Sequence, residues 1–140
     1  MKTSTLCVQL GRGEDAYGAI VPPIYQTATF EQPTATEFGE YDYTRSGNPT
    51  RALVEQQLAA LEDGHYACAF ASGMAALTAL TRIVKSGEEI IAGDDLYGGT
   101  VRLLDRLASQ QNISVRYVDT TSGDELRSVL TGRTDRKSVV

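Results

Sequence analysis

Apolar residues recur at regular spacings only from about residue 48 onward. Val54, Leu58 and Leu61 fall on one face of a predicted helix, because residues three and four positions apart share a helical face. Asn48 is a suitable N-cap for this helix, and Pro49 is suited to its first position. The pattern therefore predicts regular structure that begins with a helix at residue 49.

Strands and helices alternate beyond that first helix. The spacing predicts strands at 66–71, 89–93 and 113–118, and helices from 73, after 99 and over 124–130. Two helices carry an apolar stripe expected to be buried, Leu77, Leu80 and Val84 in one, and Val101, Leu104 and Ala108 in the other. Strands that alternate with helices of this length predict an α/β fold with a parallel sheet and crossover connections.

The first 48 residues have no such pattern. Gly, Pro, Thr and Tyr follow one another irregularly, and prolines at 22, 23 and 33 interrupt any helix or interior strand. We therefore predict an extended N-terminal arm over 1–48, followed by a domain over 49–134. An arm without a core of its own is stable only if it lies across a partner.

The last six residues, 135–140, have the sequence that a common sequencing adapter, GATCGGAAGAGCGTCGTG, encodes when it is translated. Our hypothesis is that they are a scar and that the natural reading frame runs through about Thr134. A genuine polar tail is the alternative interpretation.

Composition is typical of a folded globular piece, with 41% hydrophobic and 22% charged residues among 140. The net charge of -5 argues against nucleic acid or an anionic membrane as a main partner, since both require a basic surface. No apolar run near the N-terminus is long enough for a signal peptide or a membrane span, so we expect a cytoplasmic location.

The two cysteines do not form a recognisable framework. Cys68 lies in the predicted apolar strand, which favours a buried structural thiol. His65 is the single histidine, and neither Cys7 nor Cys68 is spaced to join it as a zinc ligand. We therefore expect no metal site.

Ligands of open parallel sheets bind where strands run into helix N-termini. The turn Ser72-Gly73-Met74 has this position, and the amides of Gly73 and Met74 could hold an anion, with the helix dipole behind them. Gly73 allows close approach because it has no Cβ. Ordinary fold punctuation is the competing interpretation of a Ser-Gly at such a turn.

Tyr97 follows the next predicted strand and precedes a Gly-Gly turn. This position suits stacking on a planar ligand, although packing over the sheet edge explains it as well. Arg45 is flanked by Tyr43 and by Ser46-Gly47, which favours bidentate phosphate binding over an ordinary solvated arginine.

Three segments resemble the Cys/Met-metabolism enzymes that use pyridoxal 5'-phosphate (PLP), the trans-sulfuration enzymes. They are 43–50 (YTRSGNPT), 71–76 (ASGMAA) and 95–99 (DLYGG), and their order and spacing match the family. Residues 22–30 (PPIYQTATF) are similar to the family's N-terminal arm. The resemblance implies the PLP-dependent transferase-like fold (fold type I), here as an incomplete large domain preceded by the arm.

The resemblance also implies roles for these residues. The turn Ser72-Gly73-Met74 would bind the cofactor phosphate, and Tyr97 would stack on the pyridine ring and assist proton transfer. Tyr43 and Arg45 would bind the phosphate of a neighbouring subunit's cofactor, so that a homodimer or homotetramer shares its active sites between chains.

The family's chemistry needs a lysine that forms a Schiff base with PLP. Lys2, Lys85 and Lys137 are the lysines of this chain, and none has a suitable place. In the family that lysine comes later in the sequence. We therefore expect an N-terminal fragment of the enzyme, inactive by itself.

Among family members, the segments 41–50 and 92–99 are most similar to cystathionine β-lyase, which cleaves cystathionine to homocysteine, pyruvate and ammonia. Cystathionine γ-synthase, the γ-lyase and the homoserine-ester sulfhydrylases are the alternatives, because the shared segments serve the cofactor rather than the sulfur amino acid substrate. A hypothesis of another class is a non-catalytic α/β module that binds a phosphorylated ligand. A third is that the fragment has no function of its own, because exposed parallel strand edges and an unanchored arm favour aggregation.

Overall fold

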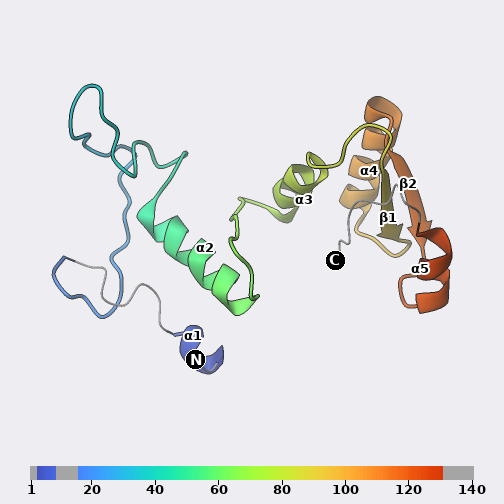
Figure 1. Ribbon diagram of the computed structural model, residues 1–140, viewed down its shortest axis with the longest axis horizontal. Helices are drawn as coiled ribbons and strands as arrows, with labels where there is room; N and C mark the ends of the chain where they lie inside the picture. The colour runs from blue at the N-terminus through green and yellow to red at the C-terminus, as the bar shows by residue number, and fades with distance from the viewer. Residues whose placement is uncertain (1–2, 9–15, 131–140) are drawn as a thin grey trace. The chain divides into compact units, whose positions relative to one another are not determined.

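The computed structural model describes residues 3–8 and 16–130 (Figure 1). The hypothesised scar at 135–140 and the predicted boundary at 134 lie outside these residues. The chain divides into two compact units, 1–69 and 70–140. The start of the helix at residue 49 is hydrogen-bonded to the arm within the first unit. The division at 48 between an arm for a neighbouring subunit and a cofactor-binding domain stays a prediction.

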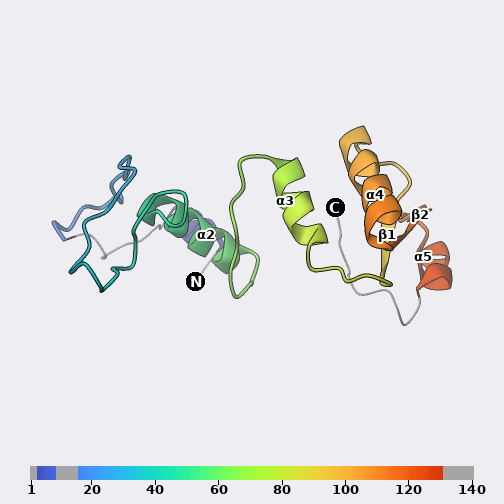
Figure 2. The same ribbon diagram turned by 90° about the horizontal axis from the view of Figure 1, so that it is seen from above.

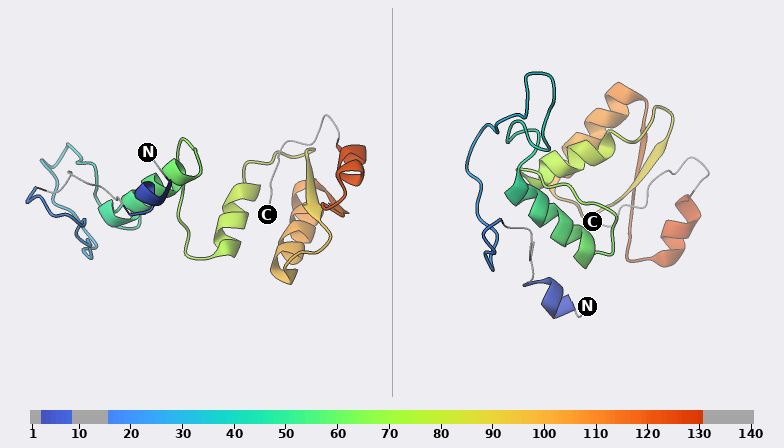
Figure 3. Two further views of the ribbon diagram at one scale, coloured as in Figure 1. Left: turned by 90° about the horizontal axis from the view of Figure 1, so that it is seen from below. Right: turned by 60° about the vertical axis from the view of Figure 1, so that its left-hand side comes forward.

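The described residues of the first unit comprise the arm and the helices α1 (Thr3–Leu6) and α2 (Pro49–Leu61). Asn48 caps α2 as predicted, since its side-chain oxygen accepts from the amide of Thr50 at 2.9 Å. The helix ends at Leu61, and the amide of Gly64 donates to the carbonyl of Ala59 at 2.8 Å. The short helix α1, which the sequence did not predict, lies beside α2 (Figure 3), where Gln57 donates to the carbonyl of Leu6 at 2.7 Å.

The arm folds back on itself before it reaches α2. Residues 28–30 and 42–44 run antiparallel, with a bridge between Thr29 and Tyr43 and backbone hydrogen bonds of 2.9 Å on either side. The rings of Phe30 and Tyr41 pack at 5.6 Å between centroids. Arm residues that carry large apolar side chains remain exposed, namely Tyr17, Ile20, Val21, Ile24 and Phe38.

The second unit has the element order α3 (Gly73–Thr81), β1 (Glu89–Gly93), α4 (Gly98–Gln111), β2 (Ser114–Val118) and α5 (Gly123–Val129). The strands pair in parallel, with Ile90 opposite Val115 and Gly93 opposite Val118. The helix α4 connects them and lies against them (Figure 2). This arrangement confirms the predicted α/β fold with a parallel sheet.

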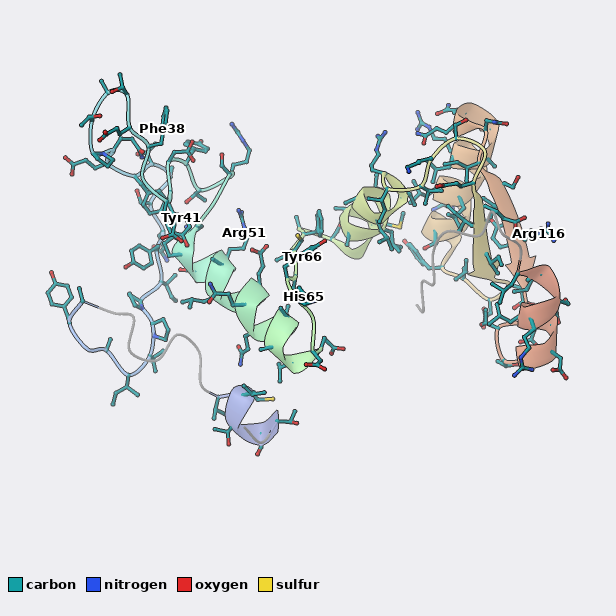
Figure 4. The ribbon with its side chains drawn as sticks, viewed as in Figure 1. Phe38, Tyr41, Arg51, His65, Tyr66 and Arg116 are labelled. Atoms are coloured by element: carbon teal, nitrogen blue, oxygen red, sulfur yellow. The ribbon has the colours of Figure 1, made fainter. Side chains whose placement is uncertain are left out.

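The core of this unit lies between α4 and the strands. Its buried apolar residues are Leu104, Leu107, Ile113 and Val118. At the start of β1, the buried carboxylate of Glu89 forms an ion pair with Arg116, at 2.6 Å between Oε1 and Nε. The labelled Arg116 can be followed on β2 in Figure 4.

Three expectations about packing were wrong. Residues 66–71 form no strand, because a strand exists only when a neighbouring strand accepts its hydrogen bonds and the described residues provide none. Cys68, expected to be buried in that strand, is exposed. The stripe expected to be buried on α3 is not buried either, since Leu80 is exposed and Leu77 and Val84 are only half-buried.

No helix among residues 3–8 and 16–130 is both long enough and apolar enough to cross a membrane.

Candidate functional site at the N-termini of α3 and α4

Ser72 starts α3 by capping it. Its backbone is extended, and its hydroxyl oxygen accepts from the amide of Ala75 at 3.2 Å. The amides of Gly73 and Met74 precede the first intrahelical hydrogen bond, and neither finds an acceptor among the described residues. Both are therefore available to bind an anion.

The space beside Gly73 is open. A Cβ placed on Gly73 would meet nothing within 4 Å. A ligand could therefore approach the backbone of this turn as closely as hydrogen bonding requires.

Gly99 brings Tyr97 and Met74 together. A Cβ placed on Gly99 would lie 2.5 Å from Cε1 of Tyr97 and 3.2 Å from the sulfur of Met74. The first turns of α3 and α4 thus lie side by side, with the tyrosine ring over the glycine. The ring remains 72% exposed, so one face is available to a planar ligand.

Tyr97 also occupies the N-cap position of α4, but its side chain forms no capping hydrogen bond. Its carbonyl accepts from the amides of Thr100 and Val101, at 2.8 and 3.3 Å. The backbone of Tyr97 is thus fixed by the helix, while its ring is held by contact alone.

Tyr43 and Arg45 form a second group, in the first unit. The guanidinium carbon of Arg45 lies 5.0 Å from the centroid of the Tyr43 ring, in cation–π geometry. No carboxylate of the described residues lies within 4.0 Å of the Arg45 nitrogens. Among the described residues, therefore, no carboxylate neutralises the charge of Arg45.

The loop that carries this pair is tied to α2 by two residues. Asn48, 7% exposed, donates to the carbonyl of Tyr25 at 3.0 Å and to the hydroxyl of Thr44 at 2.9 Å. Arg51 donates to the carbonyls of Thr44 and Ser46. The sequence pattern predicted Asn48 as a helix cap, and it gave no sign of Arg51.

The predicted site residues thus form two groups. Ser72, Gly73, Met74 and Tyr97 come together in the second unit, and Tyr43 and Arg45 come together in the first. A lysine does not join either group among the described residues, where Lys85 follows the C-terminal end of α3.

Asp119 follows the carboxyl end of β2 and is a polar group that the sequence interpretation did not identify. Hydrogen bonds from the hydroxyl and the amide of Thr121, at 2.6 and 2.8 Å, hold the pKa of Asp119 below its ordinary value of 3.8. Desolvation opposes this effect only in part. Asp119 therefore remains ionised and shapes the turn into α5.

No group of three or more His, Cys, Asp or Glu side chains that could hold a metal ion occurs within residues 3–8 and 16–130.

The donor set of the second unit suits a ligand with an anionic end and a planar body. Main-chain amides at the α3 turn bind oxygens without requiring a charged side chain, and Tyr97 provides an aromatic surface beside them. A phosphorylated aromatic cofactor bound at a parallel sheet by an α/β enzyme has these features.

Comparison with known proteins identifies the enzyme class. The sequence profile described as Cys/Met metabolism PLP-dependent enzyme matches residues 4–137, and the chain belongs to this family. The family's cofactor is PLP, as the resemblance implied.

Individual relatives agree with this assignment. The chain is 51% identical over 127 residues to cystathionine β-lyase of Arabidopsis thaliana, covering 91% of this chain and 27% of the relative. It is 42% identical to cystathionine γ-lyase of Dictyostelium discoideum, covering 95% of this chain and 35% of that protein. A crystal structure of cystathionine γ-synthase from Xanthomonas oryzae in complex with cystathionine matches with a TM-score of 0.81 at 35% identity, over 91% of this chain and 34% of the other.

The chain thus spans about a quarter to a third of the length of the relatives that it matches. These relatives and structures agree with the predicted PLP-dependent fold.

Proposed function

We propose that this chain supplies the phosphate-binding and ring-stacking half of a PLP site in a carbon–sulfur lyase. One observation carries the proposal. Tyr97 and Met74 both lie beside Gly99, and the amides of Gly73 and Met74 have no acceptor among the described residues, with open space at Gly73.

The amides of Gly73 and Met74 would donate to phosphate oxygens, and the partial positive charge at the start of α3 would stabilise the bound anion. Ser72 can contribute as well. Its oxygen already accepts from Ala75, but its hydroxyl hydrogen is not used in that bond and can be donated to the phosphate.

Tyr97 would cover one face of the cofactor ring. Stacking on an aromatic side chain is worth about 0.5–1.5 kcal/mol beyond the area buried. The phenol lies at the end of the exposed ring, so it could also exchange a proton with substrate bound next to the cofactor. When bound, PLP supplies the electron-withdrawing ring that makes the substrate α-proton acidic.

Tyr43 and Arg45 would serve the cofactor of a second protomer. Arg45 has no carboxylate partner in the described part of the chain, and a guanidinium binds phosphate in bidentate fashion. The exposed apolar side chains of the arm, such as Ile20, Ile24 and Phe38, are more readily explained if the arm packs on another subunit. We therefore propose a homodimer or homotetramer with shared active sites.

For the reaction, we propose β-elimination from cystathionine, which releases homocysteine, pyruvate and ammonia. The higher identity to a cystathionine β-lyase than to a γ-lyase, 51% against 42%, supports this choice. The second candidate is chemistry at the γ-carbon, as in the γ-lyase and the γ-synthase, since the residues assigned above would serve the cofactor rather than the γ-carbon of the substrate. The expected cytoplasmic location stays a prediction.

The test begins with the uninterrupted reading frame that contains this chain. Its product, here called the complete gene product, should contain a lysine suited to PLP beyond residue 134 and should release pyruvate from cystathionine. Release of cysteine with a four-carbon keto acid would favour the γ-lyase instead. A stop codon directly after residue 134 would contradict the enzyme and favour a small phosphate-binding module.

A further inference from the structure

Arg51 forms hydrogen bonds with the backbone on both sides of Arg45. It projects from the first turn of α2 (Figure 4), and its Nη1 donates to the carbonyl of Thr44 at 3.1 Å. Its Nη2 donates to the carbonyl of Ser46 at 2.9 Å and lies 3.5 Å from the carbonyl of Arg45. One planar guanidinium thus contacts three successive carbonyl oxygens.

This contact fixes the direction of the Arg45 side chain. The carbonyls of Thr44 and Arg45 belong to the two peptide planes that flank the Cα of Arg45, and peptide planes are rigid. Holding both carbonyls against one group therefore restrains the two backbone dihedrals of Arg45 and the bond to its Cβ. A guanidinium suits this task because its donors form a fixed fork.

The same loop is restrained from its other side. The amides of Ser46 and Gly47 both donate to the carbonyl of Tyr43, at 2.9 and 3.0 Å, and the amide of Thr44 donates to Ala28 at 2.9 Å. A Cβ on Gly47 would lie 3.1 Å from Cδ1 of Tyr41, so the loop is closely packed there. These bonds restrain the loop through its amides. Arg51 restrains it through its carbonyls.

Arg51 itself is partly neutralised. Its Nε lies 3.8 Å from Oε1 of Glu55, one helical turn further along α2, and the same oxygen accepts from the amide of Ala69 at 2.8 Å. Arg45 has no such carboxylate in the described part of the chain. The two arginines are thus different in kind, since one is engaged by protein groups and the other is free for an anion.

We propose that Arg51 is a positioning residue for Arg45. It does not contact the cofactor. It holds the loop 44–46 so that the guanidinium of Arg45 stays stacked on Tyr43 and is presented to the phosphate before the cofactor arrives. This inference rests on the proposed function, in which Arg45 binds the phosphate.

The first experiment needs no cofactor. Hydrogen–deuterium exchange of the 140-residue chain with Arg51→Gln should show about 3- to 10-fold faster exchange at the amides of Thr44, Ser46 and Gly47, as expected from loss of ordinary hydrogen bonds. The amides in the middle of α2 should be unchanged. The control is Arg106→Gln, which removes an exposed helical arginine bonded to Gln110. Unchanged exchange in the loop would overturn the proposal.

The second experiment is a double-mutant cycle on PLP release from the complete gene product. We expect Arg45→Ala to speed release strongly and Arg51→Gln to speed it about 3- to 10-fold. Arg51→Gln should add nothing when Arg45 is already alanine, because Arg51 acts only through Arg45. A merely structural role would add its full effect in both backgrounds.

The outcomes distinguish the role of Arg45 from the role of Arg51. If Arg45→Ala leaves PLP release unchanged, the proposed function of Arg45 fails. If Arg45→Ala speeds release but Arg51→Gln does not, or if their effects multiply, the role of Arg45 stands and the inference about Arg51 is wrong.

Discussion

Residues 16–69 and residues 70–130 are ordered by different kinds of interaction. In the first region, individual polar side chains such as Asn48 and Arg51 bond to backbone groups of an irregular loop. In the second, parallel strands pair and apolar side chains of α4 are buried against them. The first region therefore depends on particular atoms of a few residues, while the second depends on a pattern that many residues share.

This difference suits the two halves of the proposed site. Main-chain amides at the start of α3 are part of a helix and need no particular side chain to point at an anion. Arg45 reaches its ligand from a loop, so its usefulness depends on how firmly the loop is held. A loop that contributes to a neighbouring subunit's site must be ordered before that subunit docks, since ordering it on binding would cost conformational entropy.

The largest effect should come from the apolar core of the second region. Leu104→Ala, at a residue 5% exposed, is expected to lower the free energy of unfolding of that region by about 2–4 kcal/mol. Hydrogen exchange at the amides of β1 and β2 measures this change. The matched control is Leu58→Ala on α2, where the side chain is 45% exposed and the cost should be below about 1 kcal/mol. An equal loss of unfolding free energy at the two positions would show that the second region does not depend on a buried apolar core more than the first.

Arg45→Ala should have the next largest effect, on the cofactor rather than on folding. Loss of a charge-assisted phosphate contact of about 1.5–3 kcal/mol corresponds to PLP release about 10- to 100-fold faster from the complete gene product. The measurement is cofactor absorbance during dialysis, with the melting temperature of the apo form as a control for folding. Retention equal to that of the unmodified protein would argue against phosphate binding by Arg45.

Gly99→Ala is expected to weaken PLP binding about 2- to 10-fold, because the new Cβ must displace the ring of Tyr97 from its place beside Met74. The exposed ring can move, so the melting temperature should change little. Gly98→Ala is a close control, since its Cβ would meet only the end of Arg102, at 3.7 Å. Equal affinities for the two variants would mean that the position of Tyr97 does not matter.

The smallest effect concerns the turn after β2. The folded-state pKa of Asp119 lies below its unfolded value, so its contribution to stability is present above the unfolded pKa and is lost as the pH falls through the folded pKa. Thr121→Val removes the hydroxyl donor and should move the pKa of Asp119 part of the way back toward 3.8, as followed by NMR titration. An unchanged pKa would show that the hydroxyl is not its cause.

The two regions also differ in how far the sequence predicts them. The elements β1, β2, α4 and α5 follow from apolar spacing, and the starts of α2 and α3 follow from Asn48 and Ser72, because these signals are local. Residues 66–71 have the composition of a strand, yet a strand also needs a paired neighbour, which composition does not specify.

The site follows the same division. The turn at Ser72 and the position of Tyr97 could be predicted because they stand at strand-to-helix junctions. The contact of Gly99 with Met74 could not, since it depends on how two helices pack. The contacts of Arg51 with three carbonyls could not be predicted either, because the loop is irregular and leaves no periodic signal in the sequence.

Subunit mixing tests most directly whether two chains build each site. One form of the complete gene product would carry Arg45→Ala, and the other would carry alanine in place of the lysine that the family uses to bind PLP. The lysine variant should be inactive as a homodimer, and the Arg45→Ala homodimer should have little activity when no PLP is added. Hybrid dimers should regain one intact site, which pairs the lysine of the first subunit with Arg45 of the second, giving about one quarter of wild-type activity in an equal mixture. Mixtures that stay inactive, although hybrids form, would contradict the account.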